Sequence, residues 1–298
     1  MGAAAALGAA VAVPLLRKRL RIPTPVTIAA CAVGPLAVGV LVPPSRKREV
    51  AIFTMQMWAF TMAHEIPYDD EERARRRLRA RYPIVSDRLL GLGALPNVRL
   101  QRGLARLPGV RLLNHVLAWT HWLWFVEPYL ALAVILVRHP QRFPRAARQL
   151  AAVFDIGCAV YFAVPTAPPW WASERGLTGE EVRRIMVEVG EGTWRAAWPR
   201  MYGTLGSNPW AAMPSLHFAT SLAAGISLAE AGRVEGAVGL GYAATLGFAL
   251  VYLGEHYVTD LLAGAALVAG VRRADPLAER LHGSVGGGLR RLERFASG

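Results

Sequence analysis

The feature that most constrains this chain is a series of apolar runs long enough to cross a lipid bilayer. A membrane-spanning helix needs about 20 mostly apolar residues. Hydrophobic residues make up 53% of the sequence, which is high for a soluble domain. The chain is therefore predicted to be an all-α, polytopic transmembrane helical bundle. The expected spans are residues 24–42, 49–64, 112–137, 149–164, 214–231, 236–253 and 257–271.

The first residues, MGAAAALGAAVAVPLL, form an apolar stretch that is short for a span and is followed by the basic RKRLR. An interfacial helix, a signal-like segment and an extra span remain open for residues 3–16. The 298 residues contain no long polar block that would fold separately, so we expect one domain.

The formal net charge is +13, and Lys18 and Lys47 are the only lysines. The arginines flank apolar segments, as expected of loops that meet anionic lipid head groups, and no basic, aromatic-rich fold motif accompanies them. We therefore expect contacts with membrane lipids and none with nucleic acid. Cys31 and Cys158 both fall inside expected spans, which predicts neither a disulfide framework nor a thiolate metal site.

Two histidines are predicted to lie on the same side of the membrane. If 214–231 crosses in one direction and 236–253 returns, the start of the first span and the end of the second share a face. His217 and His256 then face the same side, and the loop 165–213, which begins PTAPPWW, leads into that side.

His256 and Asp260 are four residues apart in GEHYVTDLLAG and would share one face at a helix start. A carboxylate there can accept the N–H of an imidazole and leave the other ring nitrogen as a nucleophile or base. Ionisable residues at membrane depth indicate function unless they are paired. A paired structural histidine is the competing interpretation.

The segment PSLH begins another helix, with Pro214 suited to its first turn. Free first-turn amides and the helix dipole favour an anion such as phosphate, with the Ser215 hydroxyl as a further donor. His217 could donate a proton to a departing oxygen, although a simple serine cap remains the alternative. A metal set of His217, His256, Asp260 and Glu255 is disfavoured because no clustered-ligand signature is present.

These motifs resemble those of the type-2 phosphatidic acid phosphatase superfamily. PSLH followed about forty residues later by HYVTD is similar to its second and third signature motifs. PTAPPWW, PSLH and EHYVTDLLAG look like the branch that contains the fungal inositol phosphorylceramide synthases and their bacterial relatives. The resemblance covers roughly residues 85 to 271. It implies six core helices, with one expected span, 24–42, as an N-terminal addition.

The resemblance also implies a phosphohistidine mechanism that needs no metal or other cofactor. In it, His256 attacks phosphorus, Asp260 orients and polarises His256, and His217 protonates the leaving oxygen. The superfamily's cations are missing: PTAPPWW replaces a basic first motif, and Leu250 stands where an arginine is usual. Compensating charge is expected from the basic segment 99–111 or from loop arginines, namely Arg175, Arg195 and Arg200.

The side chains expected to contact substrate come from the converging motifs and loops: Ser215, Pro168, Trp170, Trp171, His121, Tyr257 and Arg200. For His121, a buried histidine with satisfied hydrogen bonds is the competing interpretation. Asp155 lies in mid-span and is expected to form an interhelical hydrogen bond outside the chemistry.

Three regions follow: N-terminal span(s) with a basic amphipathic segment at 1–84, a phosphatase or phosphotransferase membrane domain at 85–271, and a basic tail at 272–298 with a flexible break at SVGGG. The expected substrate is a lipid phosphate or phosphodiester. A non-catalytic lipid-binding or transport protein is the alternative. The sequence does not separate hydrolysis from transfer, and the oligomeric state is unknown.

Short basic loops at 45–49 and 138–149 oppose the site, so the positive-inside rule predicts an extracytoplasmic catalytic face. The arginines of 65–111 on the catalytic face argue the other way. Arginine-rich and alanine-rich usage suggests a bacterial plasma membrane.

Overall fold

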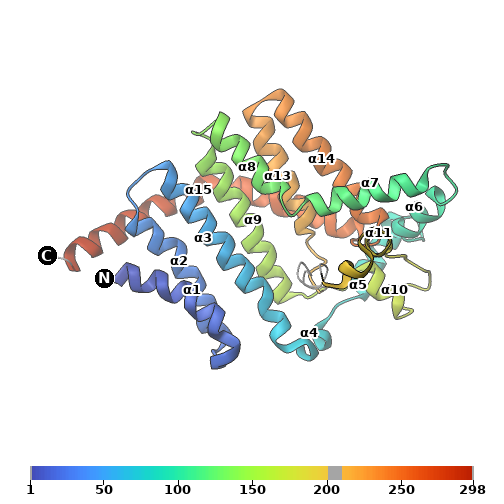
Figure 1. The fold of residues 1–298 in the computed structure, drawn as a ribbon, viewed down its shortest axis with the longest axis horizontal. Helices are drawn as coiled ribbons and strands as arrows, with labels where there is room; N and C mark the ends of the chain where they lie inside the picture. Colours follow the sequence, from blue (N-terminus) through green and yellow to red (C-terminus); the bar gives the residue numbers. More distant parts are fainter. Residues whose placement is uncertain (1, 201–209, 297–298) are drawn as a thin grey trace.

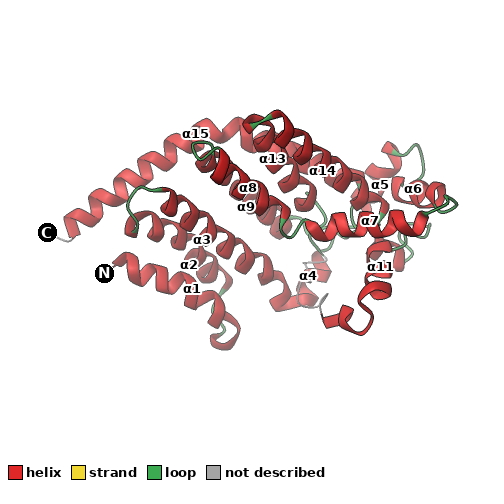
Figure 2. Cartoon of the chain, turned by 45° about the horizontal axis from the view of Figure 1, so that its top comes forward, coloured by secondary structure: helices red, strands yellow, loops and turns green. Residues whose placement is uncertain are grey.

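The computed structural model describes residues 2–200 and 210–296, except for the side chains of 68, 69, 71, 281–287 and 289–296. About 80% of it is helical, and the described residues contain no strand (Figure 2). The all-α prediction is therefore confirmed. In chain order the elements are α1 (Gly2–Leu20), α2 (Thr24–Leu41), α3 (Arg46–Glu65), the 3-10 helix η1 (Ile66–Asp70), α4 (Glu71–Arg77), α5 (Arg81–Leu90), α6 (Pro96–Leu104), α7 (Val110–Leu123), α8 (Glu127–Arg138), α9 (Phe143–Ala163), α10 (Pro169–Glu174), α11 (Ile185–Trp194), η2 (Arg195–Ala197), α13 (Leu216–Ala231), α14 (Arg233–Tyr252) and α15 (Val258–Ala296).

Helix α13 lies at the centre of the bundle and packs against α8, α9, α14 and α15 (Figure 1). The largest buried apolar cluster joins residues of α8, α9, α13 and α15 and extends to Met57 of α3. Because α13 is surrounded by other helices, the residues at its first turn are held on several sides.

Helices α13 and α14 approach closely at two glycines. A Cβ atom added to Gly225 would lie 2.9 Å from the carbonyl oxygen of Gly239. Small residues allow such backbone proximity between membrane helices. The chain between α13 and α14 is a single residue, Gly232, so the two helices form a tight antiparallel hairpin.

The apolar start of the chain forms α1, which packs along α2. The indole Nε1 of Trp58 in α3 donates a hydrogen bond to the carbonyl oxygen of Ala10 in α1, at 3.1 Å. Ala10, Val38 and Met55 form a small apolar core between α1, α2 and α3. These contacts join the three N-terminal helices as one unit.

Three described helices, α2, α9 and α14, are long and apolar enough to cross a membrane, and a bent pair, α7 with α8, brings the number to four if it counts as one span. The other expected spans coincide with helices that miss this standard by length or composition. For example, α13 has only 16 residues, and α3 begins with the charged RKRE.

The predicted continuous span 112–137 is wrong in one respect, because α7 and α8 meet at a bend of 59° (Figure 1). Pro128 lies in the first turn of α8 and has no N–H to continue a helix from Trp124. The amides of residues 124–126 instead bond to carbonyls three residues back.

The predicted flexible break at SVGGG is also not observed, because α15 continues through it to Ala296 (Figure 2). Backbone hydrogen bonds of the helix outweigh the weak helix preference of three glycines. The boundaries at 84/85 and 271/272 stay predictions.

Candidate active site

The site begins at the N-terminus of α13. Ser215 is the N-cap, and its Oγ accepts a hydrogen bond from the Phe218 amide at 3.3 Å. The Leu216 amide donates to the Tyr161 hydroxyl, which itself donates to the Pro214 carbonyl at 2.7 Å. The first turn therefore already has protein partners for two amides, and Ser215 is fully buried. Much of the anion-binding capacity predicted for this helix end is used internally.

The start of α15 is fixed by two buried polar residues that the sequence analysis did not select. The Asp87 carboxylate accepts from the amides of Val258 and Thr259, at 2.9 and 2.8 Å. The Asn97 side-chain amide donates to the carbonyl oxygens of Val251 and His256, at 2.7 and 3.0 Å. Both come from the surface helices α5 and α6, so these helices position His256. The sequence carried no clear signal for them, because Arg88 follows Asp87, Arg99 lies two residues after Asn97, and burial becomes visible only in the fold.

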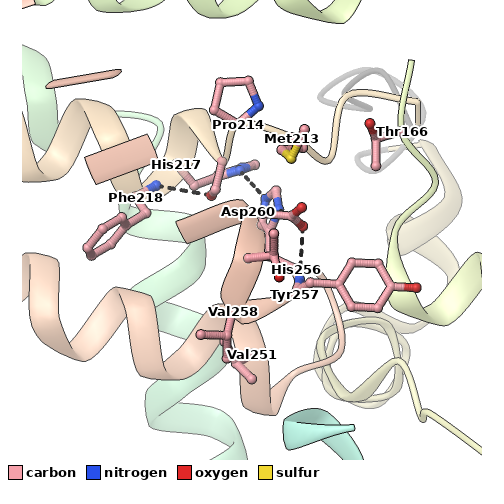
Figure 3. A network of polar contacts seen from close by, with 12 residues as sticks. Thr166, Met213, Pro214, His217, Phe218, Val251, His256, Tyr257, Val258 and Asp260 are labelled. Atoms are coloured by element: carbon pink, nitrogen blue, oxygen red, sulfur yellow. Dashed lines mark hydrogen bonds and ion pairs between the residues drawn. The ribbon is translucent and has the colours of Figure 1, made fainter. Parts of the chain in front are cut away.

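His217, His256 and Asp260 form one continuous polar chain (Figure 3). His256 Nε2 lies 3.3 Å from His217 Nδ1, and His256 Nδ1 lies 3.2 Å from Asp260 Oδ2. Asp260 Oδ2 also accepts from the Tyr257 amide at 2.9 Å. His256 is only 4% exposed and Asp260 is fully buried. The predicted spatial convergence of the three residues is observed.

This chain of contacts selects one imidazole tautomer. When His256 donates its Nδ1–H to the Asp260 carboxylate, its Nε2 keeps a lone pair that points toward His217. That nitrogen can act as a nucleophile or a base. His217 is the only side chain that the hydrogen bonds of the described residues place on that nitrogen.

Aromatic rings surround His217. Its ring centroid lies 4.1 Å from that of Trp124 and 4.9 Å from that of His121. His121 is 6% exposed, and neither of its ring nitrogens has a hydrogen-bond partner among the described residues. The competing interpretation of His121 as a satisfied buried histidine therefore does not fit, and its nitrogens remain available to a ligand.

The PTAPPWW loop is held beside the site by backbone hydrogen bonds. The Thr166 amide donates to the Trp210 carbonyl oxygen at 2.9 Å, and the Ala167 amide donates to the Arg79 carbonyl oxygen at 2.9 Å. Tyr82 contacts the Thr166 hydroxyl at 2.6 Å, and burial raises the pKa of Tyr82 to about 12. Tyr82 therefore stays protonated at neutral pH.

The loop aromatics carry cations on their faces. The guanidinium of Arg184 lies 3.8 Å from the ring centroid of Trp170, and that of Arg175 lies 3.6 Å from the ring centroid of Trp171. Trp171 also meets Trp210 edge-on at 5.9 Å. This stacking restricts the orientation of each guanidinium and of the indole ring that it covers.

Arg184 is a further candidate that the sequence analysis missed. Its guanidinium donates to both carboxylate oxygens of Glu255, at 2.9 and 3.2 Å, and Glu255 directly precedes His256. The Gln101 side chain forms hydrogen bonds with the backbone of Arg183 and of Tyr252. These bonds hold the chain at Arg184 close to the chain at Glu255. The only sequence signal was an arginine in the loop that leads to the site.

Other predicted contact residues lie at varied depths. Pro168 is the buried N-cap of α10, and Tyr257 is fully buried with a hydroxyl that has no partner in the described part of the chain. Arg200 and Arg195 are exposed. Residues 201–209 of the same predicted loop lie outside the described residues.

One expectation concerns a residue outside the site. Asp155 accepts an interhelical hydrogen bond from Gln56 of α3, as predicted. The described residues contain no group of three or more His, Cys, Asp and Glu side chains arranged to hold a metal ion. Glu255, a member of the disfavoured metal set, pairs with Arg184 instead.

One family model matches this chain, that of the PAP2 superfamily, over residues 87–273. No curated protein and no solved structure matches it. The matched region contains α13 with His217, the start of α15 with His256 and Asp260, and the loop that carries Arg184. PAP2 superfamily members are phosphatases and phosphotransferases. Since the model covers more than half of the chain, this protein belongs to the PAP2 superfamily.

Proposed function

We propose that this chain is an integral membrane phosphatase or phosphotransferase that acts on a lipid phosphate or phosphodiester through a phosphohistidine at His256. One observation carries the proposal: the buried chain of contacts from Asp260 through His256 to His217. It gives His256 an oriented nucleophilic nitrogen and gives that nitrogen a neighbouring acid.

In the first step, His256 Nε2 forms a bond to phosphorus, and the bond from phosphorus to the leaving oxygen breaks. His217 donates a proton to that oxygen, and Asp260 stabilises the positive charge that develops on His256. In the second step, water or an alcohol attacks phosphorus, His217 accepts its proton, and the P–N bond breaks. Substrate phosphate must enter between the two imidazoles, replacing their 3.3 Å contact.

Arg184 is our candidate for the phosphate-binding cation, in the role of the superfamily's missing lysine and arginines. It is partly buried, it is oriented by Trp170 and Glu255, and Glu255 adjoins the nucleophile. A guanidinium can exchange a bidentate carboxylate for a bidentate phosphate without changing its own geometry. Arg175, Arg195 and Arg200 are exposed, whereas Arg184 is partly buried and pairs with the residue that precedes the nucleophile.

A lipid substrate is favoured because the nucleophile lies just after the end of α14, a helix long and apolar enough to span a bilayer. Arg184, which pairs with the adjoining Glu255, stacks on the Trp170 ring. The motif resemblance to inositol phosphorylceramide synthases favours transfer to an alcohol. The same phosphohistidine would also accept water, so pocket shape decides between the two reactions. We place the catalytic face outside the cytoplasm, by the distribution of short basic loops.

The test uses purified wild type, His256→Ala and His217→Ala with phosphatidic acid, an isoprenyl phosphate and phosphatidylinositol. Free phosphate and new phospholipid are measured together, with an alcohol acceptor present. We expect turnover in the wild type and its loss in both variants at unchanged thermal stability.

Phosphate release would identify a phosphatase, and a new phospholipid without release would identify a transferase. Undiminished activity of either variant would contradict the mechanism. A wild type that is stabilised by lipids but turns none of them over would favour a lipid-binding or transport protein.

A further inference from the structure

A large cavity, open to the outside as a groove, lies between the three N-terminal helices and α8. Its volume is about 940 Å³, within the range of small-molecule sites. Residues from four helices line it: Leu7, Val11, Val38, Arg46, Lys47, Val50, Ala51, Thr54, Met55, Trp58, Leu136 and Val137. Only Leu136 and Val137 belong to the region matched by the family model.

The cavity lies at the end of the bundle opposite the active site. Arg46 and Lys47 begin α3, and Leu136 and Val137 end α8, whereas the site residues lie where α13 and α15 begin. An ion pair between Arg138 and Glu235 joins the end of α8 to the start of α14 at this same end. Catalytic chemistry therefore does not explain the cavity.

The walls of the cavity offer a ligand almost no polar partner. The Thr54 hydroxyl donates to the Val50 carbonyl at 2.9 Å, and the Trp58 indole donates to the Ala10 carbonyl at 3.1 Å. The remaining uncharged lining residues have aliphatic or thioether side chains. A hydrocarbon chain fits such walls, because it leaves no polar group unsatisfied.

The mouth of the cavity is cationic. Arg46 and Lys47 are exposed, and neither forms a hydrogen bond or ion pair with the described residues. Arg48 beside them pairs with Glu49 at 3.4 Å, and its Nε and Nη1 atoms are buried without a partner among those residues. The acidic Glu49 is thus matched by Arg48, and two unmatched positive charges remain at the end of an apolar groove.

We propose that this groove binds one anionic phospholipid of the leaflet opposite the active site. An acyl chain lies along α1, α3 and α8, and the lipid phosphate contacts Arg46 and Lys47. An apolar groove with cations at one end complements an anionic lipid, and basic pockets between membrane helices select such head groups. A zwitterionic lipid fits the same walls but gains less from the two cations. The proposal does not depend on the catalytic one.

The experiment places the full-length protein in nanodiscs of phosphatidylcholine with about 10% phosphatidylglycerol, extracts it in mild detergent and measures retained lipids by native mass spectrometry. The variant is Arg46→Gln/Lys47→Gln. The matched control is Arg142→Gln/Arg233→Gln, which removes two exposed arginines at the same end of the bundle.

We expect wild type and control to retain one phosphatidylglycerol in preference to phosphatidylcholine. The variant should lose that preference by roughly thirtyfold, because each of the two removed cations contributes roughly 1 kcal/mol near a surface. Ala51→Trp, which fills the groove and keeps both charges, should lose the lipid as well. Phosphatase or transferase turnover in detergent should be unchanged in Arg46→Gln/Lys47→Gln.

Equal retention of the two lipids by the wild type overturns the proposal, as does equal loss in the variant and its control. Retention that survives Ala51→Trp but not Arg46→Gln/Lys47→Gln would mean surface attraction without a groove, which also overturns it. A wild-type dimer whose interface protects the groove would identify a second copy as the occupant and overturn it in favour of self-association.

Discussion

At the scale of single residues, the site depends on how few groups touch the nucleophile. Asp260 supplies only Oδ2 to His256 and to the Tyr257 amide, and its Oδ1 has no partner among the described residues. The main effect of a carboxylate held in this way is to fix the tautomer of the His256 imidazole, and proton uptake from solvent is secondary. Removing the negative charge of Asp260 and changing the geometry of its contact with His256 should therefore lower turnover to a similar extent.

Asp260→Asn is expected to lower kcat by roughly 10²-fold or more, because an amide can donate to His256 Nδ1 and favour the wrong tautomer. Steady-state turnover at neutral pH measures this. Asp155→Asn is the matched control, since Asp155 is a partly buried aspartate that bonds to Gln56 of α3. A kcat for Asp260→Asn equal to that of the control would remove Asp260 from the mechanism.

Arg184→Gln should lower kcat/KM by about 10- to 100-fold, because a charge-assisted bidentate contact to phosphate is lost. Arg184→Lys should recover only part of the loss, since an ammonium keeps the positive charge but cannot form two parallel hydrogen bonds to phosphate. Arg183→Gln is the control, because the neighbouring Arg183 is exposed and pairs with Glu188. Equal kinetics for Arg184→Gln and Arg183→Gln would direct the search to another cation.

At the scale of elements, surface helices hold the membrane helices in register at the site. Asp87 of α5 caps α15, and Asn97 of α6 bonds to the chain just before it. The carbonyl of Asp260 also accepts from the Ser215 amide at 3.0 Å, which joins the starts of α15 and α13. The surface segment that contains α5 and α6 thus holds the backbone of the candidate site in place, in addition to any contact it makes with lipid.

Asp87→Ala is expected to destabilise the protein by about 1–2 kcal/mol, because it removes a helix cap, and to lower turnover by displacing His256. Thermal unfolding in detergent and activity well below the unfolding temperature measure the two effects. Asp70→Ala provides the control, since Asp70 caps the exposed α4 through the Arg73 amide at 3.0 Å. If both substitutions had equal effects on turnover, capping by Asp87 would not position the site.

At the scale of the whole molecule, the two ends of the bundle differ in how arginines are used. At the site end, Arg184 and Arg175 stack on the indole rings of Trp170 and Trp171 in α10. At the other end, Asp275 of α15 accepts from Arg145 and Arg148 of α9, at 3.1 and 2.9 Å. The opposite end therefore contains cross-helix ion pairs in addition to the cationic loops on which our orientation rests.

Single cysteines in a Cys31→Ser/Cys158→Ser background test the orientation. Glu181→Cys, at an exposed loop position, should react with an impermeant maleimide in intact cells. Arg142→Cys, exposed at the opposite end, should react only after permeabilisation. The reverse pattern would place the catalytic face in the cytoplasm, as the arginines of 65–111 would favour.

The sequence alone predicted the helical class, the resemblance to the superfamily now matched over residues 87–273, and the convergence of His217, His256 and Asp260. These follow from local patterns: apolar run length, a histidine and an aspartate at helical spacing, and the reversal of direction between successive spans. Such patterns depend only on residues close together in the sequence, so they can be recognised before the tertiary structure is known.

Only the tertiary structure decided the bend between α7 and α8, the capping of α15 by Asp87, and the pairing of Arg184 with Glu255. Asp87 lies 171 residues before the amide it accepts from, and Arg184 lies 71 residues before its carboxylate. No periodicity connects groups so far apart along the chain. Their proximity depends on the packing of α5, α6 and the segment 165–200 against the long apolar helices, which the sequence specifies only through the complete fold.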